Sequence, residues 1–244
     1  MKLVQLGPLR IDGVTPRIAV PFRDGTPAEQ IAEATRRGMD IAELRIDLFR
    51  DRNRDAVLGE IARFQNVPVL ATIRSAAEGG QWAGADAERC ALYEAVLPHV
   101  AAVDVELSST AIVGEVIAAA HDGERCVVVS FHDFEKTPPA STLDDIANRA
   151  HDAGAVIVKI AATCNTPEDL RTLAEYTLRH RDKGLVTIGM GEIGLASRIF
   201  FPALGSLFTF ASFGDGTAAG QIPLVKTAEY LRSFYPPRAA RESG

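Results

Sequence analysis

The sequence has few residues of the kinds that mark disulfide-rich, zinc-binding or membrane-spanning proteins. Its 244 residues include three cysteines, Cys90, Cys126 and Cys164, which are odd in number, lie far apart and form no CxxC or Cys/His spacing. Neither a disulfide framework nor a metal site is therefore expected, and a reduced cytoplasmic location fits. No run of about 18 apolar residues occurs, which argues against a membrane span. Polar residues, glycine and proline interrupt the first sixteen residues, so no signal peptide is expected.

Charge of one sign is not concentrated anywhere. The net charge is −6 and the 26 basic residues are dispersed, so the chain has no basic patch that would bind nucleic acid or an acidic membrane. A small soluble substrate is the better expectation. The composition, 47% hydrophobic and 24% charged, is ordinary for a globular protein. Because no linker or shift in composition divides the chain, residues 1–244 are expected to form a single domain.

Short apolar runs recur along the whole chain. They are RIAVPF (17–22), MDIAELRID (39–47), VPVLATIR (67–74), VAAVDVEL (100–107), RCVVVSFH (125–132), AVIVKIAA (155–162), LVTIGMG (185–191) and LFTFASF (207–213), spaced by 22 to 33 residues. Several are apolar almost throughout, which is typical of parallel strands covered on both faces.

Segments with helical periodicity lie between these runs, most clearly at 26–38, 141–154 and 166–184, each opening with Ser or Thr and ending at Gly. Eight strand–helix units in 244 residues predict a (β/α)8 TIM barrel, whose usual size is about 250 residues. An open doubly wound sheet is the structural alternative. The first sixteen residues precede the first barrel strand, and we expect them to form a short N-terminal β-hairpin that closes the barrel bottom.

Charged side chains fall at the carboxyl ends of the predicted strands, where barrels of this kind carry their active sites. They come from six strands or the segments that follow them: Glu43, Arg45, Asp47, Arg74, Glu78, Asp104, Glu106, His132, Lys159 and Arg198. Their convergence on one rim predicts an active site there.

Lys159 is the unexpected residue of the stretch GAVIVKIAAT, residues 154–163. Alternate residues of a strand share a face, so Lys159 points the same way as Ile157. If that face is the barrel interior, partial desolvation favours the neutral, nucleophilic amine, which condenses with ketones. The alternative is a lysine on a sheet edge or one reaching to solvent, but a closed barrel has no edge.

His132 ends a very apolar strand next to that of Lys159, whereas His99, His121, His151 and His180 lie in or near predicted helices. An imidazole with a pKa of about 6.5 can take and return a proton near neutral pH. A core histidine bonded to a backbone carbonyl is the competing interpretation. Adjacent strands lie about 4.8 Å apart, so both side chains can reach one ligand, which suggests Schiff-base chemistry.

Three further segments contain residues that could bind a ligand. Arg198 lies in the first turns of a predicted helix, where its planar fork suits a substrate carboxylate, although a surface arginine is the alternative. The glycine-rich GDGTAAGQ, residues 214–221, is a loop that could close over a ligand. GMGEIG, residues 189–194, matches GxGxxG, but it lies in the seventh unit and leaves Lys159 unexplained, so a dinucleotide site is disfavoured.

These residues resemble the type I 3-dehydroquinate dehydratases, the Schiff-base class of the shikimate pathway. The matching blocks are ELRID (43–47), TIRSAAEGG (72–80), SFHDFEKTP (130–138), VKIA (158–161), GEIGLASR (191–198) and AAGQ (218–221). The resemblance implies a (β/α)8 barrel, commonly a homodimer, that needs neither metal nor cofactor. It also implies a hydro-lyase that converts 3-dehydroquinate to 3-dehydroshikimate on the way to aromatic amino acids, although the sequence does not separate this role from quinate breakdown.

The resemblance also assigns roles to residues. Lys159 would form the imine with the C3 ketone, His132 would remove the C2 proton and help the C1 hydroxyl depart, and Glu78 would position His132. The predicted substrate contacts are Arg198 on the carboxylate and Glu43, Arg45, Arg74 and Gln221 on the ring hydroxyls and carboxylate, with Met190 packed near the ring. The family usually has serine four residues before the glutamine; here Thr217 keeps the hydroxyl and adds a methyl group.

Two other functions remain open at this point. A class I aldolase or transaldolase would use the same lysine on a sugar-phosphate ketone, and would need a phosphate-binding backbone nest after the last two strands. A barrel that binds a small acid as a sensor would bind ligand without turnover.

Overall fold

The computed structural model describes residues 2–214 and 221–235. Its strands are β1 (Val4–Leu6), β2 (Leu9–Ile11), β3 (Arg17–Phe22), β4 (Ile41–Arg45), β5 (Val69–Thr72), β6 (Ala102–Glu106), β7 (Cys126–Asp133), β8 (Ile157–Thr163), β9 (Leu185–Met190) and β10 (Phe208–Phe210). Strands β3 to β10 pair in parallel in the order β10-β3-β4-β5-β6-β7-β8-β9. The two ends of this order meet where Leu207 N donates to Leu185 O at 2.8 Å. The predicted (β/α)8 barrel is therefore confirmed, and the open doubly wound sheet is wrong.

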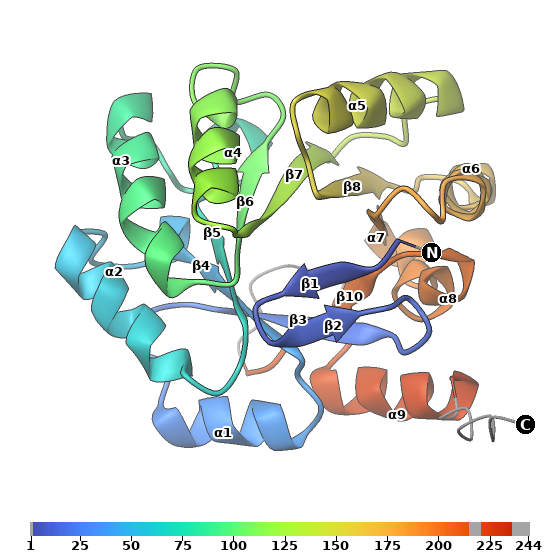
Figure 1. Cartoon of the computed structure of the whole chain (residues 1–244). Coiled ribbons are helices and arrows are strands. Elements are labelled where there is room, and N and C mark those ends of the chain that lie inside the picture. Colours follow the sequence, from blue (N-terminus) through green and yellow to red (C-terminus); the bar gives the residue numbers. More distant parts are fainter. Residues whose placement is uncertain (1, 215–220, 236–244) are drawn as a thin grey trace, which may run out of the picture.

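The helices alternate with the strands and surround them (Figure 1). They are α1 (Ala28–Arg36), α2 (Arg54–Ile61), α3 (Asp86–Val96), α4 (Val113–Asp122), α5 (Ala140–Asp152), α6 (Pro167–Arg179), α7 (Gly191–Gly194), α8 (Ser197–Leu204) and α9 (Leu224–Phe234), with single 3-10 turns η1 (Ile46–Leu48), η2 (Ala62–Phe64), η3 (Ala76–Glu78) and η4 (Leu97–His99). No helix in the described ranges is long and apolar enough to cross a membrane.

Helix starts follow the sequence signals only in part. Thr166 caps α6 in a capping box with Asp169, so two otherwise unsatisfied N–H groups have partners. The starts of α1 and α5 differ, because the chain enters them through Pro27 and Pro139 without a side-chain cap. Thr26, the expected cap of α1, instead donates its hydroxyl to Arg23 O at 3.0 Å.

The N-terminal hairpin closes the bottom of the barrel, as predicted (Figure 1). The side chains of Val4, Leu6 and Ile11 are buried and pack in one cluster with barrel residues that include Ile41 and Ala102. Gly7 makes the turn between β1 and β2 with a φ of +58°, a conformation that favours glycine. The amino ends of the strands are therefore sealed by apolar contacts.

Strand alternation separates the two faces of the barrel wall. In β8, Ile157 and Ala161 belong to the interior cluster, whereas Val158, Ile160 and Ala162 pack in the outer cluster between strands and helices. Lys159 lies between Ile157 and Ala161 on the interior face. Alternate residues of β8 therefore share a face, as the sequence predicted.

Candidate active site

Lys159 is buried beside two carboxylates and an aromatic ring. Its side chain is about as buried as the core, with a relative exposure of 5%. The Nζ atom lies 2.9 Å from Asp104 Oδ2 and 3.7 Å from Glu43 Oε1, and 4.6 Å from the centroid of the Phe210 ring. The carboxylates stabilise a charged ammonium, whereas burial disfavours the charge. The sequence predicted the burial of Lys159 but not its two countercharges, Asp104 and Glu43.

Arg74 joins the lysine to a wider polar network. Its Nη2 atom lies 2.8 Å from Asp104 Oδ1, and its Nη1 atom lies 2.7 Å from Ser130 Oγ and 3.0 Å from Glu106 Oε1. Burial opposes the charge of Arg74, but Asp104 and Glu106 outweigh it and raise the pKa of Arg74 above its ordinary value. The predicted contact of Arg74 with substrate stays a prediction, because in this structure protein partners engage both terminal nitrogens.

Asp104 is held as a carboxylate. Burial by itself would raise the pKa of Asp104, but the positive charges of Arg74 and Lys159 prevail and keep it well below the usual range. Ser130 Oγ also donates to Asp104 Oδ1 at 2.6 Å. A buried charge is tolerated only when it is paired and hydrogen-bonded, and Asp104 meets both conditions.

His132 forms a pair with Glu78. Its ring Nδ1 atom lies 2.8 Å from Glu78 Oε2, and its backbone N–H donates to the same oxygen at 3.0 Å. A carboxylate at Nδ1 favours the tautomer in which Nδ1 carries the proton and Nε2 is free to accept one. Burial, reinforced by the charges of Arg74 and Lys159, holds the pKa of His132 well below its usual value. The imidazole is therefore neutral at pH 7.

Glu43 and Arg45 face the interior from β4. Glu43 Oε1 accepts a hydrogen bond from Thr72 Oγ1 at 3.0 Å. Arg45 forms a two-point ion pair with Asp47, at 2.9 Å and 2.8 Å. Both predicted contact residues therefore lie on the rim that carries Lys159.

Arg198 is the second residue of α8 and is buried, with an exposure of 6%. Burial lowers the pKa of Arg198 to about 10. Its Nε atom has no hydrogen-bond partner among the described residues, nor does Gln221 Oε1. Buried polar atoms usually have a hydrogen-bond partner, so both atoms are open to a contact with a bound ligand. Met190 is half-buried at the end of β9, and Thr217 lies outside the described residues.

The glycines of GMGEIG serve close packing. A Cβ atom on Gly189 would lie 2.8 Å from Gly194 Cα, so neither glycine can carry a side chain without moving the backbone. Ser197 Oγ holds the same bend by accepting from Gly189 N at 2.9 Å. The contact explains the glycines without a dinucleotide and places α8 with Arg198 beside the end of β9.

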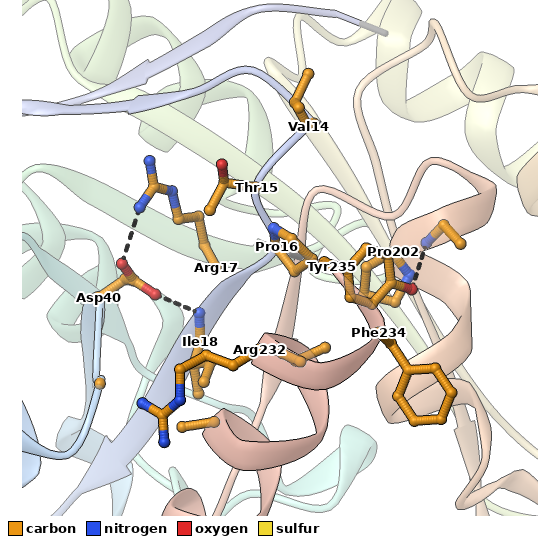
Figure 2. A pocket seen from close by; sticks show the side chains of 15 residues that line it. Val14, Thr15, Pro16, Arg17, Ile18, Asp40, Pro202, Arg232, Phe234 and Tyr235 are labelled. Carbon is orange, nitrogen blue, oxygen red and sulfur yellow. Dashed lines mark hydrogen bonds and ion pairs between the residues drawn. The ribbon is translucent and has the colours of Figure 1, made fainter. Parts of the chain in front are cut away.

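The opposite end of the barrel carries a separate cavity of about 680 Å³. It lies at the amino ends of β3 and β4 and beside the last turns of α8 and α9 (Figure 2). Arg17 pairs with Asp40 at 3.1 Å, and the Tyr235 hydroxyl accepts from Ala203 N of α8 at 2.9 Å. Dashed lines mark these contacts in Figure 2. The predicted site residues are absent from its described lining, so the chemistry belongs to the other end.

A sequence model described as type I 3-dehydroquinase matches residues 18–236. The chain belongs to the type I 3-dehydroquinase family. A 3-dehydroquinate dehydratase from Methanococcoides burtonii is 35% identical over 200 residues, which cover 80% of this chain and 85% of the relative. The family is one of hydro-lyases, so the predicted family and enzyme class are both confirmed.

Solved structures of the family have the same fold. The 3-dehydroquinate dehydratase from Geobacillus kaustophilus superposes with a TM-score of 0.88 at 30% identity, covering 96% of this chain and 98% of that one. The type I enzyme from Clostridium difficile, solved with covalently modified comenic acid, gives a TM-score of 0.87 at 28% identity, with 96% and 99% covered.

The sequence did not predict part of the polar network. Asp104 and Glu106 were placed on the rim but given no role, although the alternation of charged and apolar residues in VDVEL was a usable signal. Ser130 lies two positions before His132 in β7, so the two side chains share the interior face. Ser108 follows β6 in a turn, and its sequence neighbourhood gave no signal for a role.

Proposed function

We propose that this protein is a 3-dehydroquinate dehydratase of the shikimate pathway that works through an imine on Lys159, with His132 as general acid and base. One observation carries the proposal: the buried amine of Lys159 lies on the same rim as the neutral imidazole of His132, whose Nδ1 is hydrogen-bonded to Glu78. The family membership supports the substrate, and the site supports the chemistry.

The proposed reaction begins when the Lys159 ammonium, which is paired with Asp104, releases a proton and the resulting amine adds to the C3 ketone carbon. The released proton leaves with the ketone oxygen as part of one water molecule, which gives a protonated imine. This group is an electron sink, so the C2–H bond becomes acidic enough for an imidazole. The Nε2 atom of His132 takes the C2 proton and leaves an enamine. The C1–O bond then breaks as the hydroxyl takes the proton from His132, which restores the protonated imine. Water hydrolyses this imine to release 3-dehydroshikimate and the Lys159 ammonium.

The other residues would hold the substrate during these steps. Arg198 is proposed to bind the carboxylate, since burial lowers its pKa to about 10 and an incoming anion would stabilise its charge. Glu43, Arg45, Arg74, Gln221 and Thr217 are proposed to contact hydroxyls or the carboxylate, and Met190 to pack near the ring. The phosphate of an aldolase substrate would carry more negative charge than the single positive charge of Arg198 can neutralise.

The lysine itself supplies the electron sink, so the proposed mechanism requires neither a metal ion nor a cofactor. We also propose that residues 1–244 act as one domain, that two copies form a homodimer, and that the enzyme works in the cytoplasm without nucleic-acid or membrane partners. Size-exclusion chromatography with light scattering tests the homodimer directly.

Borohydride trapping tests the mechanism. The protein is incubated with 3-dehydroquinate, reduced with sodium borohydride, digested and analysed by peptide mass spectrometry. The expected result is a single adduct on Lys159, because reduction converts the imine to a stable secondary amine. The variant Lys159→Met should give no adduct and no turnover, whereas Lys136→Met, which removes an exposed lysine, should behave as wild type. An adduct elsewhere, or none, refutes the proposal.

A further inference from the structure

Ser108 contacts Glu78 on the rim of the barrel, between the segments that follow the neighbouring strands β6 and β5. It lies on the turn that follows β6, and its hydroxyl donates a hydrogen bond to Glu78 Oε1. The turn is anchored on both sides of this residue, since Leu107 N donates to Ser130 O at 2.9 Å and Ser109 N donates to Glu106 O at 3.1 Å. Backbone hydrogen bonds therefore hold the Ser108 hydroxyl over the carboxylate.

The two oxygens of Glu78 have different partners. Oε2 accepts both hydrogen bonds from His132, at 2.8 Å and 3.0 Å, while Oε1 accepts from Ser108. The contact at Oε1 fixes the plane of the carboxyl group, and with it the direction in which Oε2 faces the imidazole. If Oε1 were free, the carboxyl group could rotate about its last bond and weaken its contact with Nδ1.

The ionisable groups around Glu78 come from three neighbouring strands or the segments that follow them. Arg74 follows β5, Glu106 ends β6 and His132 lies on β7. Burial raises the pKa of Glu78, and the hydrogen bond from Ser108 and the charge of Arg74 oppose that rise, while Glu106 adds to it. Glu106 is itself paired with Arg74 and with Arg89. Ser108 is thus a donor that favours the ionised carboxylate without adding charge.

We propose that Ser108 is a positioning residue for the acid–base pair, holding Glu78 as an oriented carboxylate so that His132 presents its unprotonated Nε2 to the substrate. The proposal rests on the proposed role of His132 as base. Ser108 acts through Glu78 and needs no contact with substrate. If Glu78 were protonated, the carboxylate that selects the Nδ1–H tautomer would be lost.

The test is the pH dependence of kcat/KM for 3-dehydroquinate, which reports groups of the free enzyme. In Ser108→Ala, the acid limb is expected to move to higher pH by about 0.5 to 1 unit, since a donor to a charged group is lost and water replaces part of it. The acid limb moves to higher pH because ionised Glu78 is the active form, and loss of a hydrogen-bond donor raises the pKa of Glu78. Activity at the optimum falls by less than about tenfold.

Two matched variants complete the design. Ser108→Thr keeps the hydroxyl and should restore the acid limb. Thr110→Ala removes an exposed hydroxyl from the same turn, one that makes no side-chain hydrogen bond among the described residues, and should leave the profile unchanged. Borohydride should still trap the adduct on Lys159 in all three variants, because imine formation does not depend on Ser108.

The outcomes separate the two proposals. An unmoved acid limb in Ser108→Ala, an equal loss at every pH, or failure of Ser108→Thr to restore the limb overturns the role of Ser108 and leaves the imine mechanism intact. Absence of a Lys159 adduct in the wild-type protein overturns the proposed function itself, and the role of Ser108 with it. A shifted limb that threonine restores, with trapping retained, supports both.

Discussion

Replacement of Asp104 by asparagine tests whether the buried ion network stabilises the fold. Asp104 has no exposed surface, and its oxygens lie 2.9 Å from Lys159 Nζ and 2.8 Å from Arg74 Nη2. Asparagine keeps the shape of the side chain but removes the negative charge, and its amide N–H groups would face one of the two cations. Both cations then remain buried with less countercharge.

The magnitude follows from the cost of an unpaired buried charge. Removing one partner of a buried pair destabilises a protein by about 3–5 kcal/mol. Glu43 at 3.7 Å from Lys159 and Glu106 at 3.0 Å from Arg74 still offer partial compensation. We therefore expect the lower end, about 3 kcal/mol, which corresponds to a fall of about 6–12 °C in Tm for a domain of this size.

Urea unfolding at pH 7, followed by circular dichroism, measures this loss as a lower midpoint at unchanged slope. The matched control is Glu175→Gln, which removes one partner of the exposed Arg171–Glu175 pair at 4.0 Å. Exposed pairs contribute about 0–1 kcal/mol, so the control should unfold near the wild-type midpoint. A loss in Asp104→Asn no larger than that of the control would refute the reasoning, because the buried pair would then give no net stability.

Wild type and Asp104→Asn also test how the free energy of unfolding depends on pH. The pKa of Asp104 is held below its ordinary value by Arg74 and Lys159, against the effect of burial. A lowered native pKa contributes stability that is complete above the unfolded value of about 4 and is lost as the pH falls below it. The stability difference between wild type and Asp104→Asn should therefore shrink between about pH 4 and pH 2. A difference that grows in acid would contradict the assignment.

Two further predictions concern turnover. His132→Ala should still trap substrate on Lys159 while kcat falls by about 10² to 10⁴, the usual worth of general acid–base help; near-normal turnover would identify another base. Arg198→Leu should raise KM by at least about tenfold with a smaller change in kcat, because it removes a charge-assisted contact made before and during the reaction. An unchanged KM in steady-state assays would refute the assignment of Arg198 to the carboxylate.

The sequence predicted the barrel and the direction of Lys159 because both depend on short-range periodicity. An alternation of period two decides which face of β8 carries Lys159, and the structure places it on the interior face between Ile157 and Ala161. The hairpin was predicted from its position before the first barrel strand, and its burial against Ile41 confirms it.

The partners of these residues could not be predicted in the same way. The ion pair between Lys159 and Asp104 joins residues 55 positions apart, and it depends on the stagger of strands around the barrel, which a single sequence does not specify. The bond from Ser108 to Glu78 depends on the course of two turns after separate strands. The cap expected for α1 is absent for a local reason, since Thr26 donates backward to Arg23 O instead of forward into α1.

Two of the buried acids of the site, Asp104 and Glu78, favour opposite protonation behaviour, and this contrast supports the proposed role of His132 as the base. Asp104 lies between two cations that keep its pKa well below the usual range, so it is a weak proton acceptor. Its charge is suited instead to the cation beside it, and a protonated imine on Lys159 would carry the same positive charge as the ammonium at that position. Glu78 has a raised pKa, but its oxygens are occupied by His132 and Ser108. These contacts, together with the lowered pKa of His132, support the proposal that the imidazole moves the proton.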